Sequence, residues 1–187
     1  MTVFATDVDA DALLTEAGIV RIRSARPEDA AALRALHERV SPDTLYLRFF
    51  TMSPSLIGAE VDRLTRPADA DHHSLVAEVH REVVGVATYE RLSDGSQAEV
   101  AFLVDDAHQG RGIGMLLLEH LATVATAQGI VTFVAETLPA NARMLHVFAD
   151  AGFPVTTRLD DGVVQVAVPL RLDEDFRRAV DAREARA

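Results

Sequence analysis

The spacing of hydrophobic and polar side chains predicts two kinds of regular structure in the first half of the chain. Residues 19–23 (IVRIR) alternate between apolar and polar side chains, which is the pattern of a half-buried strand. Three segments then begin with a proline at the first helical position. They predict successive helices at residues 26–40, 41–50 and 53–66. Residues 74–104 predict three consecutive strands, with turns at residues 80–81 and 93–96.

The second half of the chain predicts helices and strands in alternation. A glycine-rich run at residues 109–114 leads into an apolar-periodic helix. The elements that follow are a buried strand, a helix and a hairpin, at residues 130–137, 139–152 and 153–170. The resulting order, β-α-α-α-β-β-β-α-β-α-β-β, indicates a mixed α/β domain with an antiparallel first half.

Length and composition fit one globular domain. The chain has 187 residues, of which 49% are hydrophobic and 25% are charged, and this is not the composition of a disordered chain. We expect the domain at residues 19–170 and a flexible acidic lead at residues 1–18. Residues 171–187 predict a charged helical tail, or a linker to a further domain.

Charge and cysteine content exclude several classes of function. The formal net charge of −11 disfavours nucleic acid as a partner. The absence of cysteine excludes disulfides and thiolate metal sites. Because no apolar run approaches the roughly 20 residues of a membrane span, we expect no membrane association and a cytoplasmic location. The stretch with Asp69, Asp71, His72 and His73 lacks a His-x-x-x-His pattern, so we expect a polar loop there and no metal site.

The run Gln109–Gly114 (QGRGIG) places three glycines at the start of a helix. Free backbone N–H groups and the helix dipole at such a position favour an anion, so a phosphate or pyrophosphate cradle is one interpretation. A Walker loop needs a lysine, and the chain contains none. A dinucleotide turn needs Gly-x-Gly-x-x-Gly directly after a parallel strand, whereas here the spacing is Gly-x-Gly-x-Gly. The remaining alternative is a glycine-rich turn that binds nothing.

Two motifs together resemble the GNAT acyltransferases. Gln109-x-x-Gly112-x-Gly114, which follows AEVAFLVDDAH and precedes an amphipathic helix, is similar to the acetyl-coenzyme A signature of that family. The second motif, NARMLHVFADAGF at residues 141–153, has the family's Asn and Gly-Phe at the two ends of a helix. The resemblance covers residues 19–170. It implies a GNAT-type mixed, mostly antiparallel twisted sheet flanked by helices and splayed between its two central parallel strands.

The same resemblance implies acetyl-CoA as co-substrate and no metal, with the pantetheine arm of acetyl-CoA in the cleft between the parallel strands. The residues expected to bind it are Phe102, Leu103, Val104, Gln109, Gly110, Arg111, Gly112, Ile113, Gly114, Met115, Asn141, Met144 and Phe148. Arg111 could equally be a solvated loop residue, and Asn141 could serve as an ordinary helix N-cap. Many GNATs have a tyrosine where this chain has Phe148, so the leaving thiolate must be protonated by water or leave unprotonated.

Glu99 is the candidate general base. The implied reaction is attack of an amine on a thioester, and a lysine amine must first lose a proton. Glu99 lies in an otherwise apolar strand, where a carboxylate is unusual, and the resemblance places the base at this strand position. The alternative is a partly exposed strand carboxylate or a salt-bridge partner.

A narrower resemblance concerns the acceptor. The stretches SPDTLYLRFF and AEVAFLV are similar to those of bacterial protein lysine acetyltransferases. This implies a protein substrate, with AMP-forming acyl-CoA synthetases such as acetyl-CoA synthetase as targets. Two other hypotheses share the same cofactor residues. One is a small-molecule amine N-acetyltransferase, and the other is a non-catalytic acyl-CoA-binding sensor.

Overall fold

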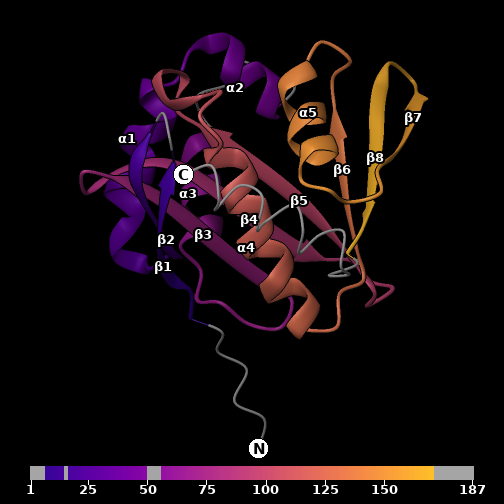
Figure 1. The fold of residues 1–187 in the computed structure, drawn as a ribbon, viewed down its shortest axis with the longest axis horizontal. Coiled ribbons are helices and arrows are strands. Elements are labelled where there is room, and N and C mark those ends of the chain that lie inside the picture. The colour runs from indigo at the N-terminus through magenta and orange to yellow at the C-terminus, as the bar shows by residue number, and fades with distance from the viewer. Residues whose placement is uncertain (1–6, 15–16, 50–55, 171–187) are drawn as a thin grey trace, which may run out of the picture.

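The computed structural model describes residues 7–14, 17–49 and 56–170, which form one sheet with helices on both faces (Figure 1). The strands are β1 (Asp9–Leu14), β2 (Gly18–Ser24), β3 (His72–Val79), β4 (Glu82–Arg91), β5 (Gln97–Val104), β6 (Thr132–Thr137), β7 (Thr156–Asp160) and β8 (Val163–Pro169). The helices are α1 (Ala30–Arg39), α2 (Pro42–Phe49), α3 (Leu56–Leu64), α4 (Ile113–Ala127) and α5 (Ala142–Asp150), with 3-10 turns at Pro27–Asp29 and Asp106–His108. The strand order is β1-β2-β3-β4-β5-β6-β8-β7.

Two hydrophobic cores hold the helices against the sheet. On one face, α4 crosses β2 to β5, and its Leu117 and Leu121 are fully buried. On the other face, Leu36 of α1 and Val61 of α3 pack against β3, β4 and β5. Each fully buried leucine stabilises the fold by about 1.5–3 kcal/mol relative to an exposed one. Helix α5 lies beside α4 and β6 (Figure 1).

The sheet splits between β5 and β6, which form its parallel pair. β5 is paired with antiparallel β4 as far as Val104, but its pairing with β6 covers only Gln97–Glu99, opposite Thr132–Val134. Beyond Glu99 the two strands diverge. The expected mixed, mostly antiparallel sheet with two central parallel strands is therefore confirmed.

The turns between strands have the backbone that two-residue hairpins require. His80 and Arg81 have φ of 51° and 69°, and Asp161 and Gly162 have φ of 46° and 81°. Positive φ at both central residues is the mark of a type I′ turn, whose twist matches that of the flanking strands. Both hairpins lie where the sequence predicts them.

Strand β1 is a correction to the expected flexible lead. It pairs antiparallel with β2, and Arg21 of β2 donates to Asp9 through Nε and Nη2 at 2.7 Å each. Its side chains alternate between exposed and half-buried positions, so the acidic segment carries little hydrophobic signal. The rest of the lead, residues 1–6 and 15–16, and the tail at 171–187 lie outside the described residues.

His72 and His73 are a second correction, because they begin β3 rather than lying in a polar loop. Both are buried; Nδ1 of His72 lies 2.7 Å from Glu90 Oε1, and Nε2 of His73 lies 3.0 Å from Ser24 Oγ. Burial lowers the pKa of His73 to about 4. Within the described ranges, no three His, Asp or Glu side chains are grouped so that they could hold a metal ion.

No helix in the described part of the chain is long and apolar enough to cross a membrane.

Candidate functional site

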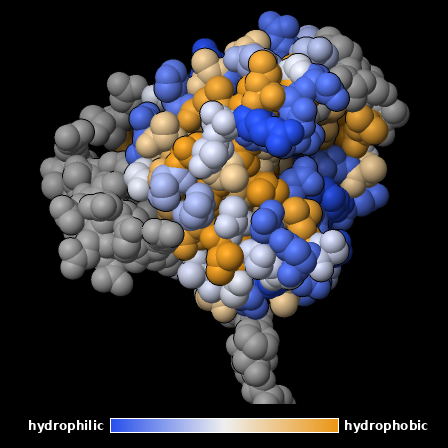
Figure 2. Space-filling view, turned by 90° about the vertical axis from the view of Figure 1, so that its right-hand side faces the viewer, coloured by the Kyte–Doolittle hydropathy of each residue, from blue (hydrophilic) through white to orange (hydrophobic). Residues whose placement is uncertain are grey.

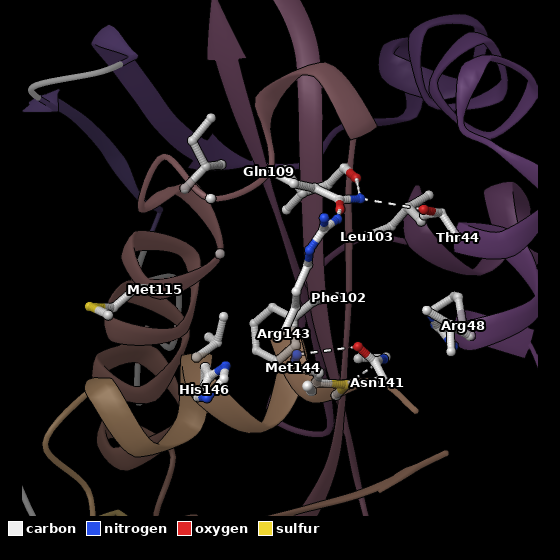
Figure 3. Close-up of a pocket in the computed structure, with 18 of the residues that line it drawn as sticks. Thr44, Arg48, Phe102, Leu103, Gln109, Met115, Asn141, Arg143, Met144 and His146 are labelled. Atoms are coloured by element: carbon white, nitrogen blue, oxygen red, sulfur yellow. Dashed lines mark hydrogen bonds between the residues drawn. The ribbon is translucent and has the colours of Figure 1, made fainter. Parts of the chain in front are cut away.

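A cleft of about 870 Å³ opens where β5 and β6 part (Figure 3). Its walls are the second half of β5, the loop before α4 and the first turn of α4, helix α5, and helix α2. This volume is within the range of about 300–1,000 Å³ that is usual for small-molecule and cofactor sites. The split in the sheet therefore provides the most evident ligand site in the described residues.

The first turn of α4 offers the cleft backbone N–H groups that have no acceptor within the helix. Gly110 and Gly112 have φ of 75° and 85°, a left-handed conformation that costs other residues about 1–2 kcal/mol. Gly112 is the N-cap of α4, and its carbonyl accepts from Leu116 N at 3.0 Å. The N–H groups of Ile113 and of the two residues after it have no acceptor within the helix. With the helix dipole, they make this end of the cleft a site for an anion.

Gly114 differs from the other two glycines. It is helical, and a Cβ atom on it would meet Val147 of α5 at 3.4 Å, an ordinary van der Waals distance. The glycine-rich run thus contains two glycines that the backbone conformation requires and a third, next to α5, where a Cβ atom would fit.

Two aspartates fix this loop to the helices on the other side of the cleft. Asp105 accepts from Arg39 Nε at 2.6 Å. Asp106 accepts from the backbone N of Ser41 at 2.7 Å and from Thr44 Oγ1 at 2.7 Å, so it holds the start of α2. Burial raises the pKa of Asp106, but these hydrogen bonds outweigh it and the pKa is lowered. Sequence reasoning did not assign either residue, although two adjacent acids after an apolar strand were a signal.

Gln109 connects three walls of the cleft. Its Nε2 donates to Val104 O at 2.9 Å and to Thr44 Oγ1 at 3.4 Å, and its Oε1 accepts from Arg143 of α5. Arg143 reaches from α5 across the cleft to make this contact (Figure 3). Gln109 was expected at the site, whereas Arg143 was not.

The edge of β5 that faces the split supplies backbone rather than side chains. Phe102, Leu103 and Val104 all line the cleft, as expected from the sequence. The side chain of Leu103 is buried in the opposite core, so only its main chain is accessible there. Because β6 pairs only up to Glu99, the N–H and C=O groups on this edge are available to a ligand that contains amides.

Asn141, Met144 and Phe148 come from α5. Asn141 lines the cleft and is also the N-cap of α5, because its Oδ1 accepts from Met144 N at 3.2 Å. Phe148 does not line the cleft: it is fully buried, with its ring 6.0 Å from that of Phe102 in an edge-to-face contact. Arg111 is not among the lining residues either, whereas Gly110, Ile113 and Met115 are.

Glu99 lines the cleft at the position where the parallel pairing of β5 and β6 stops. It is exposed, and it also lines a smaller groove of about 460 Å³ on β6, β7 and β8. Its cross-strand neighbour is Glu90. Like charges in such a position repel, but Glu90 is engaged by Arg63 at 3.2 Å, by Arg66 at 3.1 Å and by His72. Glu99 is thus left facing the open space.

A second charged wall faces Glu99 from helix α2. Arg48 lines the cleft and donates from Nη2 to Glu60 Oε1 at 2.7 Å, and Glu60 also pairs with Arg63. Burial raises the pKa of Glu60, but the two arginines outweigh it and the pKa is lowered. Arg48 is close enough to Glu99 for that carboxylate to influence its pKa. Sequence reasoning assigned no role to Arg48.

Comparisons with known proteins agree with this geometry. The model of the acetyltransferase (GNAT) family matches residues 31–153. An acetyltransferase of Pseudomonas aeruginosa is 31% identical over 157 residues, which are 82% of this chain and 84% of that protein. Acetyltransferase Pat of Mycolicibacterium smegmatis is 34% identical over 131 residues, 68% of this chain but 39% of that longer protein.

Among solved structures, the GNAT domain of S. lividans PAT is 41% identical, with a TM-score of 0.79 over 85% of this chain and 95% of that domain. The donor groups of the cleft suit a CoA thioester: the start of α4 suits the pyrophosphate, and the free edge of β5 suits the pantetheine amides. The chain therefore belongs to the acetyltransferase (GNAT) family and is an acetyl-CoA-dependent acetyltransferase.

Proposed function

We propose that the protein transfers the acetyl group of acetyl-CoA to the Nε atom of a lysine in a protein substrate, and that AMP-forming acyl-CoA synthetases are its targets. The similarity to the S. lividans PAT domain and to Pat of M. smegmatis supports a protein substrate. The observation that carries the proposal is the position of Glu99, because it lies both in the cofactor cleft and in a groove open to the surface. Acetylation would remove the charge of the target lysine and so silence the target enzyme.

Different residues of the cleft have different roles in the proposed reaction. The start of α4 and the free edge of β5 hold the thioester, which leaves its carbonyl carbon near the end of the parallel pairing. Glu99 accepts the proton of the incoming ammonium group, directly or through water. The neutral amine then attacks the carbonyl carbon, the nitrogen releases its second proton to solvent, and the C–S bond breaks, so the products are an amide and CoA thiolate. Phe148 has no proton to give and is buried, so solvent protonates the thiolate.

Direct acetylation assays test the substrate class. The enzyme would be incubated with labelled acetyl-CoA and a panel of purified acyl-CoA synthetases, and the modified sites would be mapped by mass spectrometry. We expect label on one active-site lysine of at least one synthetase. Label only on free amino acids or other small amines would instead indicate a small-molecule acetyltransferase. Binding of acetyl-CoA without turnover on any acceptor would indicate a sensor domain.

The variant Glu99→Gln tests the base. It keeps the shape of the side chain but cannot accept a proton, and loss of a general base typically lowers the rate by about 10²–10⁴-fold. We expect that loss in kcat near pH 7, an unchanged affinity for acetyl-CoA, and a smaller deficit at higher pH, where more of the lysine is already neutral. Glu38→Gln, on the exposed face of α1, is the matched control. Acetylation at the parent rate by folded Glu99→Gln at pH 7 would show that another group or solvent removes the proton.

A further inference from the structure

The groove next to the cleft offers a second contact for the acceptor. It is lined by Leu92 just after β4, by Glu99 near the start of β5 and by residues of β6, β7 and β8, and it meets the cofactor cleft at Glu99 and Glu136. Figure 2 views the molecule from the side of β7 and β8, where hydrophilic residues border hydrophobic ones instead of leaving one continuous apolar face. Such a mixed surface suits a polar peptide segment better than an apolar one.

The strand register arranges charges along this groove. Glu136 of β6 is opposite Gln165 of β8, and Gln165 is opposite Arg158 of β7. Directly opposite residues project from the same face, so these three side chains form a row across the three strands. The spacing between strands places Glu136 and Arg158 about 10 Å apart. Arg158 donates to Asp160 on its own strand at 2.9 Å, so its charge is engaged locally.

Glu136 differs from several other glutamates of the protein in having no cation as a partner. Glu60, Glu78, Glu82 and Glu90 each form a salt bridge with an arginine. Among the residues that the structure describes, neither Glu99 nor Glu136 lies within 4.0 Å of a basic nitrogen. Glu136 is also exposed, so its position in the groove is not explained by a role in the core.

The spacing of the two glutamates decides what they can bind together. Glu99 is paired with Val134, and Glu136 is two residues further along the same face of β6. One strand spacing and two residues of rise put their Cα atoms at least about 8 Å apart, because the strands diverge beyond this pair. A single ammonium group at Glu99 therefore leaves Glu136 free for a second cation. In an extended peptide, side chains two positions apart point the same way and are separated by about 7 Å.

We propose that Glu136 is a specificity-determining residue that binds a second positive charge of the acceptor. The substrate class is then an extended peptide segment in which an arginine or lysine lies two positions from the lysine that is acetylated. This inference rests on the proposed function, because it assigns the acceptor to a protein. The cofactor cleft and the base would by themselves accept any accessible lysine. Glu136 adds the requirement for a second positive charge in the acceptor sequence.

A peptide series tests the assignment with the whole chain as enzyme. Nine-residue peptides with one central lysine would carry a single arginine, alanine or glutamate at each position from two before to two after it. For the parent enzyme we expect the lowest KM with arginine two positions away, by roughly two- to five-fold over alanine, the range for a partly exposed ion pair. Glu136→Gln should remove this preference by raising the KM of the arginine peptide to that of the alanine peptide, and Glu136→Arg should favour glutamate at the same position.

The controls are Glu38→Gln and Glu38→Arg, which change the net charge by the same amounts as the two Glu136 variants but lie on an exposed helix face away from the groove. Both controls should keep the preference of the parent enzyme. A parent enzyme that acetylates every peptide with the same KM, or a Glu136→Gln variant that keeps the preference for arginine, would overturn this inference and leave the proposed function intact. Acetylation of spermidine but of no peptide and no synthetase would overturn both.

Discussion

Replacing Gly112 with aspartate separates anion binding from folding at the start of α4. Gly112 is the N-cap and has a left-handed backbone, with φ of 85° and ψ of −4°. Asparagine tolerates this conformation better than most residues, so Gly112→Asn measures the cost of adding a side chain of the same size without charge. Among the described residues, a Cβ atom there would meet the side chain of Leu14 at 3.6 Å, an ordinary van der Waals distance. Both variants should therefore fold.

The charge is expected to act on the ligand and not on the helix. A negative side chain at a helix N-terminus is stabilising by about 0.3–1 kcal/mol, so Gly112→Asp should be no less stable than Gly112→Asn. Against a phosphate charge about 4 Å away, the same carboxylate costs about 1 kcal/mol in bulk water and about 4 kcal/mol at an effective dielectric constant of 20. We therefore expect acetyl-CoA affinity to be roughly five-fold to several-hundred-fold weaker in Gly112→Asp than in Gly112→Asn.

Calorimetric titration with acetyl-CoA at low and high salt measures this difference, and thermal unfolding of both variants checks the fold. Because a partly exposed repulsion is screened by ions, the gap between the two variants should narrow at high salt. Equal affinities for the aspartate and asparagine variants, both folded, would refute the assignment of the pyrophosphate to the start of α4.

Two further predictions concern stability. Gly114→Ala should raise the free energy of unfolding by about 0.4–1 kcal/mol, because the position is helical and has room for a Cβ atom; a lower melting temperature would show that α4 and α5 cannot adjust. The free energy of unfolding should fall by about 3 kcal/mol between pH 6.5 and pH 4 because of His73. Burial lowers the pKa of His73 to about 4, so in this range mainly the unfolded chain takes up the proton. Denaturant unfolding of His73→Gln at pH 7 and at pH 4.5 should show a flatter pH dependence than the parent, and equal slopes would contradict this.

The elements with strong periodicity or turn chemistry were predictable from the sequence. Helix α4 is apolar on its buried face and follows a glycine-rich loop, and the hairpin turns contain residues that accept positive φ. Strand β1 was missed because its residues alternate between exposed and only half-buried positions, and because its acidic residues resemble a solvated tail. His72 and His73 were assigned to a loop because histidine is polar, whereas hydrogen bonds to Glu90 and Ser24 satisfy them inside the sheet.

The cofactor side of the site was more predictable than the acceptor side. Glycines at a helix start and a strand edge act through the backbone, so their role depends on local sequence. Arg48, Arg143 and Glu136 reach the cleft or the groove only through the packing of α2, α5 and β6, and each looks like an ordinary surface charge in the sequence. The opposite error occurred at Phe148. Its position in the family motif predicted that it would bind the cofactor, but its side chain is buried in the core.

The short parallel pairing between β5 and β6 has a thermodynamic consequence. Within the sheet, three paired positions join β6, β8 and β7 to β5, alongside the packing of α5 on α4, and the cofactor cleft and the groove beside it share this seam. We expect a ligand that fills the cleft to restrict the relative movement of the two parts of the sheet and with it the width of the groove. Ordering of one site would then lower the entropy cost of occupying the other. By the reciprocity of linked equilibria, a peptide bound in the groove would raise the affinity for acetyl-CoA by the same factor, so the seam would couple the two sites.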